Sequence, residues 1–171
     1  PFMSFPPAKR QRITINGERV VLVDYSASQA NVLYRYVTGQ FLHPEDPYEV
    51  DGLHRETVKY LMKMMLNNGS RRGASMAAKE NLASLKKRAP EAFESDSKNH
   101  GGIAAMMTLV EERNAPIAKC FYQGKAQGQY YAWLESNLVF EVAKHLTDQG
   151  VPALTVHDEF IVPESMESAV L

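Results

Sequence analysis

The sequence has a single cysteine, no long apolar run and almost no net charge. Because Cys120 stands alone, an internal disulfide and a zinc site built from several cysteines are both excluded, and a reducing, intracellular setting is favoured. No apolar run approaches the roughly 20 residues of a membrane span, and no signal-peptide pattern opens the chain. The net charge of −1 argues against a simple nucleic-acid coat protein. We therefore expect a cytoplasmic protein that makes no membrane contact.

The charge is unevenly distributed along the chain. Residues 52–90 carry nine Lys or Arg against two Glu, a net of +7, whereas residues 128–171 carry seven acids against one Lys, a net of −6. Basic segments attract phosphates, and clustered acids can hold divalent metals. Two solvated helical faces of opposite sign would give the same pattern, so the charge distribution alone does not decide between these interpretations.

Hydrophobic periodicity and turn residues predict an α+β fold with an antiparallel sheet. Asn16-Gly17 is a strong hairpin signal, since both residues tolerate positive φ. Short strands are expected at residues 11–16, 19–24, 153–157 and 160–162, with Asp158-Glu159 at the turn between the last two. Helices are expected at residues 26–38, with Ser26 as the N-cap, and at residues 51–66, 74–88, 103–113 and 129–149. Residues 1–9 and 91–102 predict irregular segments, residues 164–171 predict the start of a helix, and residues 115–128 are ambiguous.

Two segments place acidic residues next to apolar strands. The strand at residues 19–23 ends at Asp24, and residues 156–162 carry Asp158 and Glu159 between apolar runs. Carboxylates are costly to bury beside such strands unless a cation or a hydrogen-bond donor compensates them. A solvated turn also favours Asp, and Asp24 would serve equally well as a helix cap, so a purely structural interpretation of each stays open.

Both acidic segments resemble motifs of the family A (DNA polymerase I-like) polymerases. Residues 153–159 (Ala-Leu-Thr-Val-His-Asp-Glu) look like motif C, in which a hairpin of the palm domain presents His-Asp-Glu or His-Asp-Ser and the Asp binds metal. Residues 21–26 (Val-Leu-Val-Asp-Tyr-Ser) resemble motif A, a palm strand that ends in Asp-Tyr-Ser and is followed by a helix. The segments Leu134-Glu135-Ser136, Gly150-Val151-Pro152 and Asp46-Pro47-Tyr48 are similar to plasmid-type and phage-type members.

A basic pair lies between these motifs. Arg55 and Lys59 are four residues apart and therefore share a helix face. Motif B of the family carries such a pair, which contacts the triphosphate of the incoming nucleotide, and its Lys also stabilises the leaving pyrophosphate. An i, i+4 basic pair is common on exposed helices, but the three motifs occur here in the family's order and span about residues 19 to 163.

The resemblance implies a two-metal nucleotidyl transfer from a nucleoside triphosphate to the 3′-hydroxyl of a DNA primer-template. Asp24 and Asp158 would be catalytic together with Lys59, and their carboxylates should face one another on adjacent strands. Two Mg²⁺ ions, replaceable by Mn²⁺, would be held by Asp24, Asp158 and the supporting acid Glu159. The nucleotide-binding residues implied are Arg55, Lys59, Tyr25 and Gln29.

The implied domains are a first palm segment at residues 1–50, reduced helical fingers at residues 51–115 and a second palm segment at residues 116–171. No thumb domain is recognisable, so we expect a fragment of a longer chain that is weak or inactive alone. Lys63 and Asn67-Asn68 stand where family DNA polymerases usually have an aromatic residue and a Tyr-Gly pair. Gln29 stands where many carry a Glu that excludes the ribose 2′-hydroxyl. We therefore expect a divergent member of the plasmid or phage type.

Two alternatives stay open at the sequence level. A metal-dependent nuclease also needs clustered Asp and Glu, but it has no triphosphate for Arg55 and Lys59 to contact. A polymerase-like module without activity, which binds nucleic acid or a partner, would account for the missing aromatic residue at Lys63.

Overall fold

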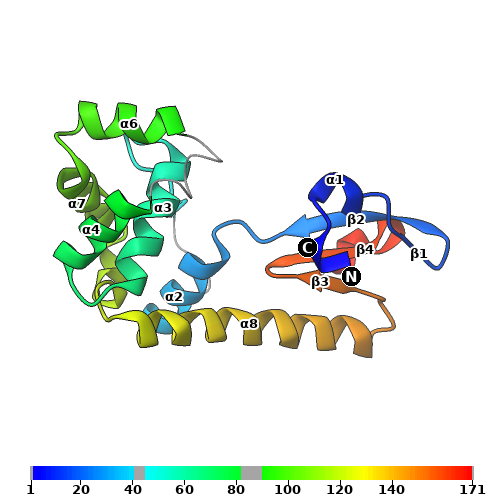
Figure 1. Cartoon of the computed structure of the whole chain (residues 1–171). Helices are drawn as coiled ribbons and strands as arrows, with labels where there is room; N and C mark the ends of the chain where they lie inside the picture. The colour runs from blue at the N-terminus through cyan, green and yellow to red at the C-terminus, as the bar shows by residue number, and fades with distance from the viewer. Residues whose placement is uncertain (1, 41–44, 82–89, 171) are drawn as a thin grey trace. The chain divides into compact units, whose positions relative to one another are not determined.

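The computed structural model describes residues 2–40, 45–81 and 90–170 of the chain. The chain divides into two compact units, which are described separately below. The first, here called the strand unit, combines residues 1–28 with residues 133–171, and the second, the helical unit, comprises residues 29–132. Figure 1 labels the α-helices and β-strands of both units. Within the described ranges no helix is long and apolar enough to cross a membrane.

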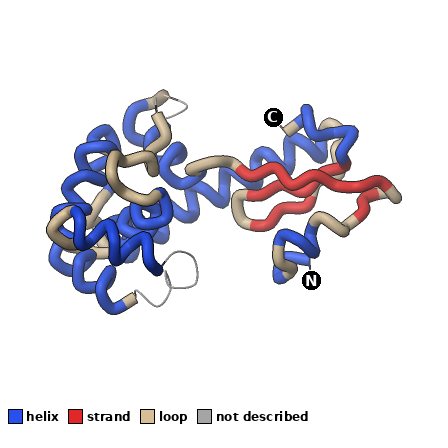
Figure 2. Tube along the Cα trace, turned by 90° about the horizontal axis from the view of Figure 1, so that it is seen from above, coloured by secondary structure: helices blue, strands red, loops and turns tan. Residues whose placement is uncertain are grey.

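The strand unit is built on a four-stranded antiparallel sheet with the order β1-β2-β4-β3, drawn in red in Figure 2. The predicted α+β class with an antiparallel sheet is therefore confirmed. The strands are β1 (Thr14–Ile15), β2 (Glu18–Asp24), β3 (Leu154–Val156) and β4 (Glu159–Pro163). The predicted β1–β2 hairpin is confirmed as well, since Asn16 and Gly17 take φ values of 54° and 82° at its turn.

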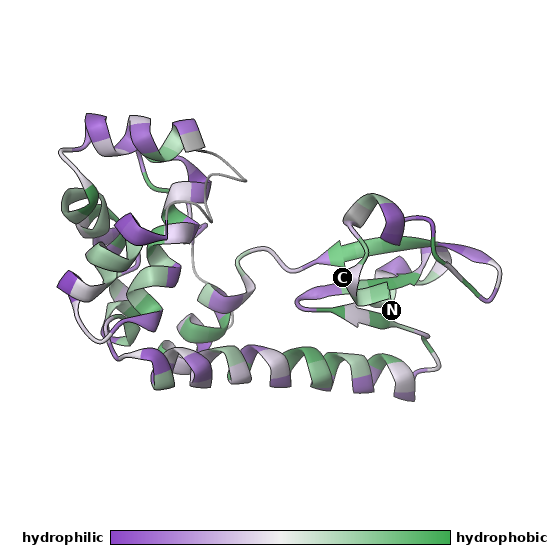
Figure 3. Ribbon diagram, viewed as in Figure 1, coloured by the Kyte–Doolittle hydropathy of each residue, from purple (hydrophilic) through white to green (hydrophobic). Residues whose placement is uncertain are grey.

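Side-chain alternation along β2 and β4 gives the sheet two apolar faces, and Figure 3 shows the hydrophobic character of β2. On one face Val23, Phe160 and Val162 pack with Leu146 of helix α8 (Lys125–Asp148). On the other face Val20, Val156 and Ile161 pack with residues of the N-terminal arm and of β1. This arm contains η1 (Phe2–Ser4) and α1 (Pro7–Arg10). The central strand β4 is thus covered on both sides.

The helical unit is centred on α3 (Arg55–Asn67), which packs against three other helices. Its buried face holds Val58, Leu61, Met62, Met65 and Leu66, at the spacing that an amphipathic helix requires. The other elements of this unit are α2 (Ser28–Thr38), α4 (Arg71–Glu80), α6 (Pro90–Asn99), α7 (Ile103–Arg113), η2 (Ala115–Cys120) and the first part of α8. The prediction of a helix over residues 103–113 is confirmed.

Helix α6 shows that the loop predicted over residues 91–102 is wrong. Pro90 follows the helix predicted at residues 74–88, and it occupies the first position of α6, where its missing N–H costs nothing. The segment has a single large apolar residue, Phe93, which packs edge-on against Tyr60 with ring centroids 5.7 Å apart. One apolar residue gives no periodic signal, so the pattern could not show this helix. The predicted end of the preceding helix, at Arg88, lies outside the described residues.

Several predicted boundaries are also corrected. Helix α2 begins at Ser28, after Ala27 with φ 54°, so Ser26 is not at the capping position. Helix α3 begins at Arg55 rather than at residue 51, because Gly52 takes φ 77° and the chain turns there. Residues 164–169 form a 3-10 helix, η3, and not the start of an α-helix.

Helix α8 begins at Lys125, and not at residue 129 as the sequence predicts. Gly128 accounts for the misplaced prediction. Gly is a poor helix residue, so the pattern placed the boundary after it. A Cβ at this position would lie 2.5 Å from Asn67 Oδ1 and 2.9 Å from the Leu66 carbonyl oxygen. The glycine is therefore required by close contact with the end of α3, and not by a break in α8.

Gly128→Ala is expected to lower the free energy of unfolding by about 1–3 kcal/mol, because the new methyl group would overpack against a backbone carbonyl that cannot move freely. On an unconstrained helix the same change would stabilise. Urea denaturation followed by circular dichroism measures the difference. Gly69→Ala is the matched control, since a Cβ there would meet nothing closer than 3.9 Å. A stabilised Gly128→Ala protein would contradict the close contact.

Candidate active centre

The strand unit brings its predicted acidic residues to one end of the central strand pair. Asp24 is the last residue of β2, and the register of β2 with β4 places it directly opposite Glu159. Residues opposed in this way have Cβ atoms about 4.5–5.5 Å apart and point to the same face of the sheet. Asp158 immediately precedes β4, and its carbonyl oxygen accepts a hydrogen bond of 3.5 Å from the Tyr25 backbone N–H. Asp24, Asp158 and Glu159 therefore gather at one end of the sheet, and we call them the carboxylate group.

The β3–β4 turn differs from the prediction by one residue. Val156 pairs with Glu159, so the two turn residues are His157 and Asp158, and Glu159 belongs to β4. His157 takes φ 57°, as a two-residue hairpin turn requires. The side chain of Glu159 is 14% exposed, which is unlike a solvated turn residue. The predicted Asp158-Glu159 turn is therefore corrected, and of the two acids Asp158 alone lies in the turn.

The N-terminal arm supplies a cation to this end of the sheet. Arg10 Nη1 lies 2.6 Å from Glu159 Oε1, and the two side chains are 12% and 14% exposed. The contact is an ion pair without the alignment of a hydrogen bond, since neither Glu159 Oε1 nor Arg10 Nε has a hydrogen-bond partner among the described residues. Burial raises the pKa of Glu159; the positive charge of Arg10 opposes this rise, and the charges of Asp24 and Asp158 add to it.

Glu135 of α8 is a further acid near the carboxylate group. The sequence indicated it only as part of the Leu134-Glu135-Ser136 segment. Burial raises the pKa of its carboxyl; a hydrogen bond with Ser28 opposes the rise, the charge of Asp158 adds to it, and His157 opposes it. Glu135 lies four residues before Val139, which packs toward the sheet. This i, i+4 relation to the sheet-facing residues of α8 is a signal that would have placed Glu135 on the same side.

The side chains of Asp24 and Asp158 have the chemistry of magnesium ligands, although they do not form a complete metal site by themselves. Carboxylate oxygens are the ligands that Mg²⁺ prefers. Asp24 is the last residue of β2, and Asp158 lies in the turn that leads into the neighbouring strand β4. In the part of the chain that the structure describes, no three His, Cys, Asp or Glu side chains are grouped as a metal site. Glu159 is also engaged by Arg10. Asp24 and Asp158 are thus the residues that would hold a metal, with Glu159 paired beside them.

The two predicted nucleotide-binding residues after Asp24 have different surroundings. The Tyr25 ring packs edge-on against Phe160 with centroids 5.7 Å apart, and its hydroxyl donates a hydrogen bond of 3.2 Å to the Val170 carbonyl oxygen. Burial raises the pKa of this phenol. Gln29 lies in the first turn of α2 and is partly exposed. Tyr25 therefore packs into the strand unit, while Gln29 keeps an accessible side chain.

In the helical unit, Arg55 and Lys59 lie on one face of α3 around a common aromatic ring. The Arg55 guanidinium carbon is 5.1 Å and the Lys59 ammonium 5.5 Å from the centre of the Tyr48 ring. Arg55 also pairs with Asp46 at 3.1 Å, and Lys59 lies 3.7 Å from Glu56. Burial would raise the pKa of Asp46, but the Tyr48 N–H, Arg55 and Lys59 outweigh it and hold that pKa below its usual value. The Asp46-Pro47-Tyr48 segment and the basic pair therefore form one cluster, which the sequence had shown only as separate motifs.

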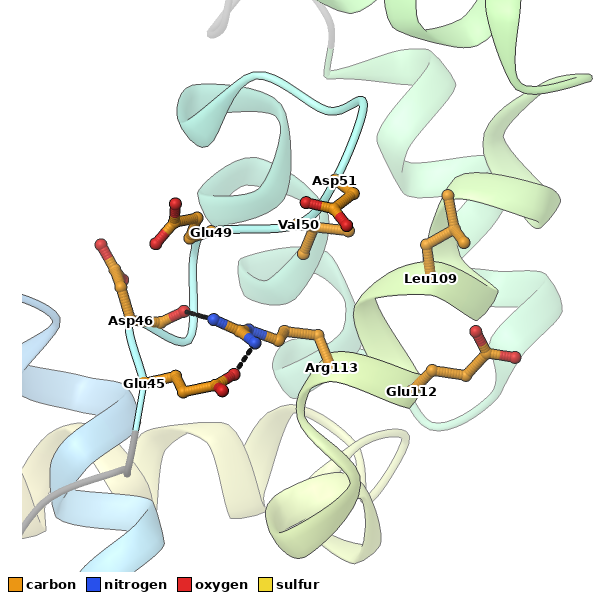
Figure 4. A pocket seen from close by; sticks show the side chains of 8 residues that line it. All are labelled: Glu45, Asp46, Glu49, Val50, Asp51, Leu109, Glu112 and Arg113. Carbon is orange, nitrogen blue, oxygen red and sulfur yellow. Dashed lines mark hydrogen bonds and ion pairs between the residues drawn. The ribbon is translucent and has the colours of Figure 1, made fainter.

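A cavity of about 590 Å³ adjoins this cluster through Asp46 (Figure 4). Arg113 crosses it, forming an ion pair with Glu45 and donating hydrogen bonds of 3.3 and 3.2 Å to the Asp46 carbonyl oxygen. Its lining is acidic apart from Arg113, Val50 and Leu109: Glu45, Asp46, Glu49, Asp51 and Glu112. Through Glu45 and the Asp46 carbonyl oxygen, Arg113 holds the chain before α3 against the end of α7.

No protein-family model, curated protein or solved structure matches this chain. The inference of function therefore depends on the site residues themselves.

Proposed function

We propose that this chain carries the active centre of a nucleotidyltransferase of the family A polymerase type, with the strand unit as palm and the helical unit as reduced fingers. The observation that carries the proposal is the position of Asp24 at the end of a central strand, opposite Glu159 and next to the turn that holds Asp158. Two segments far apart in the sequence, each resembling a catalytic motif, thus meet at one end of the β2–β4 pair, where Asp24 lies opposite Glu159.

The residues have complementary roles in this reaction. Asp24 and Asp158 would bind two Mg²⁺ ions, which activate the primer 3′-hydroxyl and stabilise the in-line transition state at the α-phosphate. Arg55 and Lys59 would bind the triphosphate, since a forked guanidinium and a compact ammonium both suit phosphate oxygens. Lys59 would also stabilise the charge that develops on the leaving pyrophosphate. Asp46, Glu56 and the Tyr48 ring orient this basic pair before a nucleotide binds.

Asp24→Asn is expected to reduce metal-dependent primer extension by about a thousand-fold, because losing one metal-binding charge removes several kcal/mol of transition-state stabilisation. The assay uses a labelled DNA primer-template, nucleoside triphosphates and Mn²⁺. Asp148→Asn is the matched control, since Asp148 is 64% exposed and forms an ion pair with Lys144 on the neighbouring turn of its own helix. Undiminished extension by Asp24→Asn would refute the proposal.

Mn²⁺ binding provides a second measurement in case the chain extends primers weakly on its own. The wild type should bind Mn²⁺ more tightly than either Asp24→Asn or Asp158→Asn. Degradation of the labelled DNA, without any requirement for a nucleoside triphosphate, would indicate a nuclease instead.

A module that binds nucleic acid without activity is the second candidate. It is favoured by the α3 surface, because Lys63 and Asn67 stand at positions that carry aromatic residues in family DNA polymerases. The Asn67 side chain instead donates a hydrogen bond of 2.9 Å to the Lys63 carbonyl oxygen. Under this candidate, wild type and Asp24→Asn would bind DNA equally, and neither would extend the primer or bind Mn²⁺.

A further inference from the structure

Arg10 brings a positive charge to the carboxylate group through its ion pair with Glu159. It reaches Glu159 from the N-terminal arm, and both side chains are largely covered. Arg10 closes α1, where its backbone N–H donates a hydrogen bond of 3.1 Å to the Pro6 carbonyl oxygen. Its own carbonyl oxygen accepts a bond of 3.0 Å from the Ile13 N–H, and Ile13 packs against the sheet core. The guanidinium is thus presented from a backbone that is fixed on both sides.

The carboxylate group needs such a cation. Asp24 and Glu159 are cross-strand partners, and like charges in this relation destabilise a sheet. Asp158 adds a third negative charge one residue away. Repulsion among these acids would move Glu159 outward and with it the turn that it anchors, since Glu159 is the first residue of β4 and pairs with Val156 across that turn.

Stability alone does not account for the pair. A buried ion pair generally contributes little net stability, because desolvation of both charges offsets their attraction. Arg10 also leaves its Nε without a hydrogen-bond partner among the described residues, which adds to the cost. The benefit of the contact therefore lies in where it places Glu159 and the residues next to it.

We infer that Arg10 is a positioning residue of the carboxylate group: it holds Glu159 opposite Asp24 and thereby fixes the turn that presents Asp158. Glu159 is then the anchor of the N-terminal arm, and Asp24 and Asp158 are the residues that bind metal. This inference rests on the proposed function, and it extends the active centre to a segment that carries none of the three motifs.

The test compares Mn²⁺ affinity, measured by electron paramagnetic resonance, in the full chain and four variants: Arg10→Met, Arg10→Lys, Glu159→Gln and the double variant Arg10→Met/Glu159→Gln. Arg10→Met should raise the Kd about 10–100-fold, the usual effect of losing a residue that orients metal ligands. Arg10→Lys should restore most of the affinity. Glu159→Gln should also weaken binding, because it leaves Arg10 unpaired beside the metal-binding acids. The double variant should recover to within about threefold of the wild type, since neither charge then needs a partner.

Three results would overturn the inference. Tighter Mn²⁺ binding by Arg10→Met would mean that Arg10 merely competes with the metal. A double variant as weak as Glu159→Gln would make Glu159 itself a metal ligand. Equal weakening by Arg12→Met, a matched change at an exposed residue of the same arm, would make the effect nonspecific.

Thermal unfolding of the metal-free variants separates this inference from the proposed function. Each single variant should lower the Tm, and the double variant should recover at least half of the combined loss. If the wild type binds Mn²⁺ no better than Asp24→Asn, the proposed function fails, and the Tm cycle then decides whether Arg10 positions Glu159. Additive Tm changes would reject that coupling.

Discussion

Phe160→Ala is expected to lower the free energy of unfolding by about 3–5 kcal/mol, the usual cost of removing a buried aromatic ring from a core. Phe160 is fully buried, and it lies in β4 between Val23 of β2 and Thr155 of β3. Its ring also contacts Tyr25, so the cavity would open directly beneath the residue that follows Asp24. Because β4 is covered on both faces, the surroundings have little room to collapse into the space.

Urea denaturation followed by circular dichroism measures this loss. Phe140→Ala is the matched control in the same unit, since Phe140 is 67% exposed on α8, and its substitution should change stability by less than about 0.5 kcal/mol. A loss below about 1 kcal/mol for Phe160→Ala would contradict a packed position at the centre of the sheet.

Asp96→Ala is expected to cost about 2–3 kcal/mol, because it removes a charged acceptor that ties α6 to the start of α3. Asp96 is 2% exposed. Its Oδ2 accepts a hydrogen bond of 3.0 Å from the His54 backbone N–H, and its Oδ1 lies 2.9 Å from His54 Nδ1. Without the carboxylate, this N–H at the start of α3 loses its acceptor. Denaturation curves test the loss, with Asp148→Ala as the exposed control.

The contribution of Asp96 should also depend on pH. Burial would raise the pKa of its carboxyl, but the hydrogen bonds it accepts, including those from His54, outweigh burial and hold the pKa below its usual value. Stability from a group with a lowered pKa is present above the unfolded value, about 3.9, and is lost as the pH falls through the folded value. The stability difference between wild type and Asp96→Ala should therefore shrink as the pH falls below about 4. A difference that does not shrink over this range would contradict an ionised, hydrogen-bonded Asp96.

Turn residues and the spacing of apolar residues predicted the elements that depend on interactions between neighbours in the sequence. Asn16-Gly17 allowed the β1–β2 turn to be placed, and the apolar spacing of residues 103–113 defined α7. The parts that were missed depend on distant contacts. Helix α6 is held by Phe93 against Tyr60 and by Asp96 at the start of α3. Neither contact produces a hydrophobic periodicity in the sequence of α6.

The same distinction applies to the candidate active centre. The strand ends indicated Asp24 and Asp158, because an apolar run that stops at an acid is visible in the sequence. Arg10 was not visible, since it closes the short helix α1 in a segment for which the sequence predicts no regular structure. It also acts on a residue at the other end of the chain. The grouping of Tyr48 with Arg55 was likewise hidden, because the sequence showed the aromatic residue and the basic pair as unrelated features.

The pairing of β2 with β4 also constrains the order in which the chain can acquire its structure. Residues 20–24 pair with residues 159–163, so the edge of β2 that faces β4 stays unpaired until β4 has been synthesised. The helices of residues 29–132 rely on contacts nearer in sequence and can form earlier. During synthesis at about 5–20 residues per second, β2 thus presents an open strand edge for several seconds. Arg19 and the terminal Asp24 flank its apolar stretch, and such charges are a common protection against wrong strand pairing at an open edge.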